Sequence, residues 1–116
     1  MRSRFRTSLG TVSGTSASVL LTSSDAALAF VDAGGSGVTF RIEAAIGEGA
    51  SKTWGQLGTQ SVTVAANGNE ITPVTVLLAG TTAKPIRNPT HICPGEVRFV
   101  VTAGSADFHV EGLRLL

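Results

Sequence analysis

The side chains that most often carry chemistry are few and scattered in this chain. Its only histidines are His91 and His109, and its only cysteine is Cys93. His91 has no carboxylate close by in sequence, and Cys93 has neither a helix start nor a second base beside it to favour the thiolate. We therefore interpret Cys93 as a small buried hydrophobe, and we expect no internal disulfide and no thiol-based zinc site.

Acidic residues offer two arrangements for acid–base chemistry. Glu43 with Glu48, or Asp107 with Glu111, could converge in space as the two carboxylates of a glycosidase do. The acidic residues otherwise do not cluster. His109 alternates with apolar neighbours, so we expect it on the outward side of a strand, in solvent or at an interface. The sequence predicts no catalytic residues, and we expect a protein that is not an enzyme.

The glycine-rich stretches give no support for phosphate or cofactor binding. Residues 34–37 (GGSG) and 47–49 (GEG) match neither the dinucleotide fingerprint nor the P-loop, and neither precedes a helical pattern. The serines include no nucleophile elbow of the Gly-x-Ser-x-Gly type. We therefore expect no bound cofactor and no metal ion.

The elements that would position these residues are predicted to be β-strands. Residues 38–46 alternate, with five apolar side chains on one face and polar ones on the other. Residues 96–102 alternate in the same way, residues 103–106 supply a glycine-bearing turn, and residues 107–113 continue the apolar pattern. These last segments predict a closing hairpin, in which Gly112 marks a bulge or a bend.

Turn-forming residues separate the other predicted strands. Residues 32–37 (DAGGSG) predict a turn, Asn67-Gly68 predicts a hairpin turn, and Pro73 marks an edge strand or a bulge. Residues 80–94 contain three prolines and predict a long ordered loop, which in a compact domain is usually functional or interfacial. With seven or eight strands and no helical period, the fold class is all-β. We predict a two-sheet antiparallel β-sandwich and leave jelly-roll-like or Ig-like topology open.

The first 18 residues differ in composition from the rest and predict an extended basic arm, followed by a sandwich domain of residues 19–116. Arg2, Arg4 and Arg6 are two residues apart, so they share one side of an extended chain. They give residues 1–24 a charge of +3, whereas residues 25–116 have six basic and eight acidic residues and a charge of −2. Phe5 favours an arm that docks on another protein, because a solubilising tail has no use for an aromatic ring.

The overall composition favours contact with other protein. Charged residues make up 15% of the chain, against about 25% in typical domains, so copies repel each other little. We expect no membrane contact, because no run of 18 apolar residues occurs. Nucleic acid is not an expected partner either, because the predicted domain has no basic face or aromatic stripe. Trp54 either fills the core or forms a surface platform for a ligand.

The residues of the predicted closing hairpin resemble a known group of proteins. Residues 94–102 (PGEVRFVVT), a short Gly/Ser turn and residues 107–113 (DFHVEGL) look like the last hairpin of small β-sandwich proteins from tailed-bacteriophage virions. Capsid decoration (cement) proteins best fit a chain of this size with an arm. The resemblance implies a jelly-roll-like domain, assembled in the host cytoplasm, that binds the outside of an icosahedral head as a dimer or trimer.

This interpretation makes the major capsid protein and other copies of the chain the expected partners. The expected contacts lie in the arm and in the proline-containing loop: Arg2, Arg4, Phe5, Arg6, Arg87 and His91. Arginine suits such contacts because its guanidinium binds carboxylates with two parallel hydrogen bonds. Two alternatives remain, a carbohydrate-binding or adhesin-like module and a tail or baseplate subunit. A carbohydrate-binding module predicts an exposed Trp54 indole, whereas a cement protein predicts a buried or covered one.

Overall fold

The structure, a computed structural model, describes residues 2–21, 24–47, 49–74, 76–77, 91–92 and 94–115. Its strands are β1 (Arg2–Val12), β2 (Val19–Leu20), β3 (Ser24–Ile46), β4 (Thr53–Val64), β5 (Asn69–Pro73), β6 (Val76–Leu77), β7 (His91–Ile92) and β8 (Glu96–Leu115), with one 3₁₀ turn, η1 (Gly49–Ser51). Most of the predicted proline-containing loop lies outside the described residues, and so do Arg87 and Cys93.

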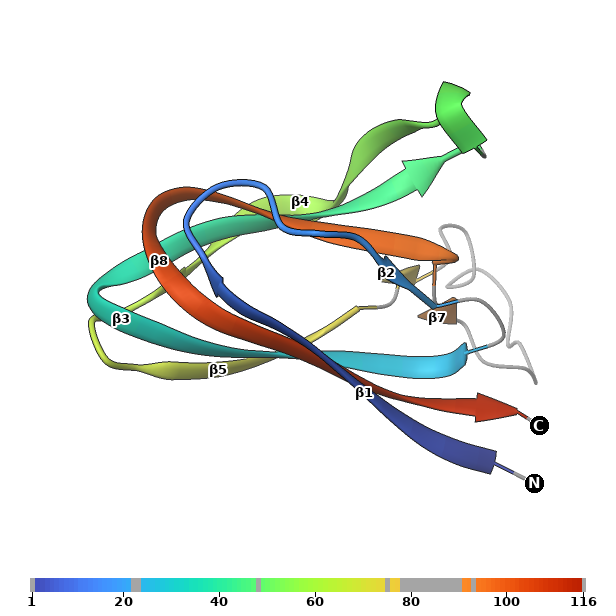
Figure 1. The fold of residues 1–116 in the computed structure, drawn as a ribbon, viewed down its shortest axis with the longest axis horizontal. Helices are drawn as coiled ribbons and strands as arrows, with labels where there is room; N and C mark the ends of the chain where they lie inside the picture. The colour runs from blue at the N-terminus through green and yellow to red at the C-terminus, as the bar shows by residue number, and fades with distance from the viewer. Residues whose placement is uncertain are drawn as a thin grey trace.

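Two long strands, β3 and β8, form the centre of the fold. They pair antiparallel along most of their length, from Ser24 opposite Arg114 to Ala44 opposite Val97. Both strands bend near their middles, so that each passes from one layer of the molecule into the other (Figure 1). Shorter strands extend the two layers on either side.

The layers have the same plan. The first layer contains β1, residues 106–115 of β8, residues 24–33 of β3, and β5, in that order. The second layer contains β2, residues 96–104 of β8, residues 38–46 of β3, and β4. The short strands β6 and β7 pair with each other in a separate small sheet. The described strands confirm the predicted all-β class and its two-layer antiparallel sandwich.

Glycines make the two bends possible. The register between β3 and β8 passes from Ala33 opposite Ala106 to Val38 opposite Gly104, so residues 34–37 of β3 bulge out of the ladder. Gly37 and Gly104 have φ angles of 73° and 74°, in the left-handed region that residues with a Cβ disfavour. A Cβ on Gly104 would lie 2.0 Å from the Gly37 carbonyl oxygen, a separation that only glycine permits.

The predicted closing hairpin is therefore wrong, and so is the predicted turn at residues 32–37. Residues 96–115 form one strand instead of two strands joined by a turn, and residues 32–37 lie within β3. The two glycine-bearing segments face each other, so the chain bends while the pairing of β3 with β8 continues. A turn does lie at Asn67-Gly68, between β4 and β5, with Asn67 at a φ of 57°. The predicted hairpin is wrong, because β4 and β5 each pair with β3, in different layers.

The core lies between the layers and centres on three phenylalanines. Phe40 and Phe99 come from the second layer and Phe108 from the first, and all three are buried. The Phe108 ring stacks on Phe99 at 4.8 Å between centroids and meets Phe40 edge-on at 5.0 Å. Apolar side chains at alternate positions complete the core, including Ala27, Ala29, Val31, Val38, Ile42, Val64, Val97 and Val110.

The amino-terminal residues do not form the separate arm that their composition predicts. Residues 2–12 are extended, as expected, but they form β1, which pairs with β8 from Arg2 opposite Leu115 to Val12 opposite Ala106. Val12 is buried, and the Ser16 amide donates a 2.8 Å hydrogen bond to the Phe99 carbonyl. The physical reason is that β8 would otherwise present an unpaired edge, which β1 covers.

The ring of Phe5 explains Gly112. Gly112 stays in register, opposite Phe5 in β1 and Ala27 in β3, so the bulge predicted at this position is absent. A Cβ on Gly112 would lie 2.4 Å from Cε1 of Phe5. The glycine makes room for the aromatic ring, which packs against the core of its own chain.

Candidate functional site

The outward side chains of the first layer form four rows across its strands, and we call this surface the first-layer face. From the chain ends toward the bends, the rows are Arg4–Leu113–Ala26, Arg6–Glu111–Leu28–Pro73, Ser8–His109–Phe30–Ile71 and Thr11–Asp107–Asp32–Asn69. They alternate with buried side chains such as Ala29 and Val110, because successive residues of a strand point to opposite sides.

On β3 and β5, the middle of the first-layer face is apolar and aromatic. Leu28 is 41% exposed and Ile71 is 55% exposed, which is unusual for large aliphatic side chains on neighbouring strands. Between them, the Phe30 ring lies flat on the His109 imidazole, with 4.6 Å between centroids and 7° between the planes. His109 Nε2 and Glu111 Oε2 are 3.0 Å apart. The prediction that His109 lies on the outward side of a strand is confirmed.

Charges lie at the two ends of the face. Arg4 and Arg6 are exposed at the end near the chain termini, while Asp32 and Asp107 are exposed at the end near the bends. Thr11 Oγ1 donates a hydrogen bond to Asp107. The end near the chain termini therefore has two arginines against one glutamate, Glu111, which lies opposite Arg6, and the end near the bends has two aspartates. The apolar side chains of β3 and β5 lie between these ends.

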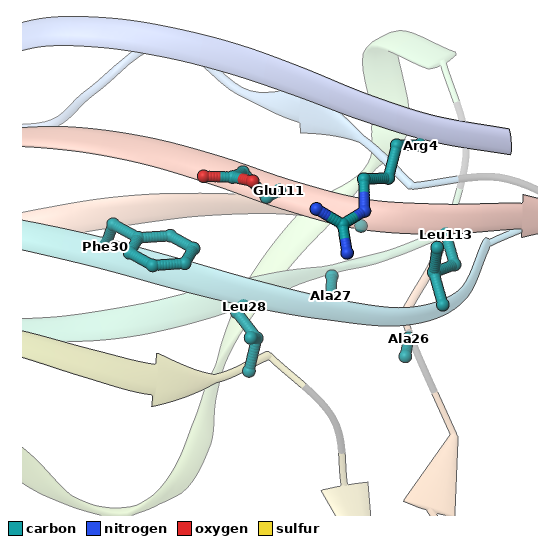
Figure 2. A pocket seen from close by; sticks show the side chains of 8 residues that line it. Arg4, Ala26, Ala27, Leu28, Phe30, Glu111 and Leu113 are labelled. Carbon is teal, nitrogen blue, oxygen red and sulfur yellow. The ribbon is translucent and has the colours of Figure 1, made fainter.

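Two shallow hollows lie on this face and share Phe30. The first, of about 240 Å³, is lined by Arg4, Leu28, Glu111 and Leu113 among others, and the second, of about 480 Å³, by residues around Ile71 and Asp107. Figure 2 shows the Arg4 side chain lying across β8, between Glu111 and Leu113, with its guanidinium toward β3. The hollows are open and shallow, which suits contact with a protein surface more than enclosure of a small molecule.

On the outer face of the second layer, positive and negative groups lie beside each other and form ion pairs. Glu43 is 7% exposed, and it accepts hydrogen bonds from Arg41 Nε at 2.9 Å and from Arg98 Nε at 2.8 Å. Lys52 Nζ donates to both carboxylate oxygens of Glu96, at 2.8 and 3.1 Å. The charges of both carboxylates are therefore compensated by cations of the same layer.

Trp54 belongs to the same network. The Arg98 guanidinium carbon lies 4.3 Å from the centroid of the Trp54 ring, and Lys52 Nζ lies 5.7 Å from it. Such cation–π contacts hold the indole half-buried against its own sheet. Trp54 is thus neither the core plug nor the open platform that the sequence allows, because cations of its own chain cover it.

The pKa of Glu43 gives one testable consequence. Burial alone would raise this pKa, but the hydrogen bonds from Arg41 and Arg98 outweigh it and lower the pKa below its ordinary value of 4.5. A carboxyl group with a lowered folded-state pKa stabilises the protein above its unfolded-state pKa, and this contribution is lost as pH falls through the folded-state pKa.

We therefore expect Glu43→Gln to lower the free energy of unfolding by about 1–3 kcal/mol at neutral pH, as for loss of hydrogen bonds to a charged group. The difference between the variant and the wild type should narrow below about pH 4.5, the ordinary pKa of this group. Urea unfolding of both proteins across a pH series measures this difference in the free energy of unfolding. A difference that stayed constant with pH would show that Glu43 ionisation does not stabilise the fold.

The structure places the expected partner-contacting residues in different surroundings. Arg4 and Arg6 lie on the first-layer face, whereas Phe5 points inward and packs on Gly112. Arg2 and His91 lie in β1 and β7, and their side chains are outside the described residues, as is the whole of Arg87. Of the expected contacts, the structure brings Arg4 and Arg6 together on one surface.

The predicted carboxylate pairs do not form a site within the described residues. Glu48 lies outside them, and Glu43 is held by two arginines. Asp107 and Glu111 share one face of β8 but are four residues apart in an extended strand, or about 13 Å, farther than a glycosidase pair. In the described part of the chain, no three His, Cys, Asp or Glu side chains gather as metal ligands would, and no helix there is long and apolar enough to span a membrane.

Sequence reasoning missed Leu28, Ile71 and Asp32 as parts of one surface. A signal was present in residues 26–31 (AALAFV), where Leu28 and Phe30 share one face and the smaller Ala27 and Ala29 share the other. The structure shows that Ala27 and Ala29 point inward and that Leu28 and Phe30 point outward. The sequence pattern showed that the side chains alternate between two faces, but it did not show which of the two faces is buried.

These features define a two-layer β-sandwich whose first-layer face combines exposed apolar side chains with side chains of both charges. A solved structure, that of the SPBc2 prophage-derived protein YomS, is similar, with a TM-score of 0.56 over 97% of this chain and 95% of that chain. The two sequences are 10% identical, so the likeness shows the shared fold. Comparisons with protein families and with curated proteins gave no match.

Proposed function

We propose that this chain is a non-enzymatic structural protein of a tailed-phage virion, a capsid decoration protein that binds the outside of the head. The observation that carries the proposal is the first-layer face, where exposed Leu28 and Ile71 lie between basic and acidic ends. Exposed apolar patches framed by charged residues are typical of protein–protein interfaces.

Two further observations support this proposal. The similar structure of YomS is that of a prophage-derived protein, and it is similar along nearly the whole of both chains. The polar groups that could hold a small ligand are paired within the chain around Glu43 and Trp54. A protein that acts by holding other chains together needs an extensive surface rather than an enclosed cleft.

In this function the chain assembles with copies of itself and with the major capsid protein, and it stays on the capsid surface after assembly in the host cytoplasm. Arg4 and Arg6 are the arginines of the predicted arm whose side chains are described, and both lie on the first-layer face. In this function they contact carboxylates of a neighbouring chain, with the two-pronged geometry that favours arginine. Neither nucleic acid, a membrane nor a cofactor has a part in it.

The test is binding of the purified full-length chain to undecorated heads of candidate tailed phages. We expect saturable co-sedimentation with heads, with a copy number that follows the icosahedral symmetry, and greater resistance of the decorated heads to heat. Purified tails form the second arm of the experiment. Binding to tails and not to heads would reassign the chain to the tail or baseplate.

A panel of soluble glycans forms the third arm, and Trp54 is the probe because it is the only tryptophan. A sugar that displaced Arg98 from the indole would change its fluorescence. We expect no change. A saturable change with no binding to either particle would overturn the structural function in favour of a carbohydrate-binding module.

A further inference from the structure

We propose that the first-layer face is the contact between two copies of this chain, packed face to face about a two-fold axis. The axis lies in the plane of contact, crosses the strands at right angles, and passes between the row of Leu28 and the row of Phe30. The inference rests on the proposed function, which makes copies of the chain one of its partners, and it assigns the first-layer face to that partner. The dimer is expected in the purified protein in solution, without phage particles.

The area of the face is sufficient for such a contact. In this layer β1, β3 and β8 contribute ten or eleven residues each and β5 contributes five. At about 3.3 Å per residue and about 4.8 Å between strands, they give roughly 550 Å² of flat area per copy. Two copies would bury about 1,100 Å², which is above the roughly 1,000 Å² that a specific contact requires. Its apolar part would contain Leu28 and Phe30 of β3 and Ile71 of the edge strand β5, from both copies.

The two-fold arrangement brings opposite charges together. It places the row of Arg4 over the row of Thr11 and Asp107 in the other copy, so the basic end of each face covers the acidic end of its partner. It also places Glu111 over His109, and Leu28 over Phe30, each twice. A two-fold contact needs a surface that complements itself in this way.

This complementarity favours a second copy as the occupant. A partner with a strongly acidic or strongly basic surface would match one end of the face and repel the other. On this face the arginines lie toward the chain termini and the aspartates toward the bends. A half-turn about the proposed axis therefore places the arginine end of each copy over the aspartate end of the other. The second-layer face has no such order, because its acidic residues lie beside cations of the same layer, so the two signs of charge are mixed there and are not separated along the strands.

The first experiment compares two isoleucines of similar exposure on different faces. Ile71 is 55% exposed on the first-layer face, and Ile46 is 61% exposed at the end of β3 in the second layer. Sedimentation equilibrium of the full-length chain should show a reversible dimer. Ile71→Asp should weaken the dimer by at least about tenfold, because it places a desolvated charge in the apolar centre, whereas Ile46→Asp should leave the dissociation constant unchanged.

The second experiment reverses the charges. Arg4→Glu and Asp107→Arg each create like charges across the interface, and each should weaken the dimer on the order of tenfold. The double variant restores opposite charges between the copies and should recover most of the affinity. Circular dichroism and thermal unfolding of each variant confirm that it is folded, and Leu28→Asp serves as a second probe of the apolar centre if one variant is not.

The outcomes separate this inference from the proposed function. A monomeric wild-type chain, or a dimer that Ile71→Asp and Leu28→Asp leave intact, would overturn the proposed interface whether or not the chain binds heads. Single charge reversals that the double variant did not rescue would overturn the two-fold register. A dimer with the expected variant effects that bound no phage particle would support the interface and reject the decoration function.

Discussion

Deletion of residues 1–12 is expected to unfold the protein. β1 is paired with β8 along almost its whole length, and Val12 is buried while Phe5 and Leu9 pack against the core. Loss of these contacts leaves the edge of β8 exposed and removes on the order of 5 kcal/mol, comparable with the whole stability of a small domain. Circular dichroism and urea unfolding of the truncated chain measure the effect.

The matched control keeps the strand and removes only a charge. Arg6→Ala changes an exposed side chain of β1 and should alter the free energy of unfolding by no more than about half a kcal/mol. A truncated chain that unfolded cooperatively at the wild-type urea midpoint would place β1 outside the folding unit. The sequence alone predicts that outcome, since it treats residues 1–18 as a separate arm.

Gly104→Ala is expected to lower the free energy of unfolding strongly, although it adds only one methyl group. The new Cβ would lie 2.0 Å from the Gly37 carbonyl oxygen, an atom of the opposing backbone that cannot rotate away. The residue would also keep a φ of 74°. We expect a loss of about 4 kcal/mol or more in the free energy of unfolding, measured by urea denaturation.

Gly10→Ala separates the effect of the positive φ angle from the effect of the steric clash. Gly10 has a φ of 67°, and no atom lies within 4 Å of the position of its added Cβ. Its substitution should cost only the conformational strain, about 1–2 kcal/mol. Equal losses at Gly10 and Gly104 would mean that the close approach of β3 and β8 does not restrict the bend.

The sequence predicted the local features of the fold well. Alternation at residues 38–46 and 96–101 identified side chains that are now seen buried, including Phe40 and Phe99, because the period of a strand is a property of the strand itself. Asn67-Gly68 predicted its turn because left-handed conformations favour these residue types.

Pairing between distant segments could not be predicted in this way. The glycines at residues 34–37 and 103–106 looked like two separate turns, and only their position opposite each other makes them bends in two continuous strands. β1 pairs with β8 about a hundred residues later, and the composition of residues 1–12 contains no sign of its partner. Trp54 is covered by Arg98, which also lies far from it in sequence.

The candidate site was predicted only in part for the same reason. The spacing of Arg4 and Arg6 placed them on one side of an extended chain, and the structure confirms this. The apolar middle of the face combines Leu28, Phe30 and Ile71 from two strands, so it appears only when β3 and β5 are paired.

The passage of β3 and β8 through both layers also determines how the molecule bears mechanical load. In a sandwich whose layers are joined only by loops, a pull on one layer is resisted mainly by side-chain packing across the core. Here the same two backbones run through both layers. Tension applied at one outer surface therefore reaches the other through covalent bonds, and the two sheets resist being peeled apart.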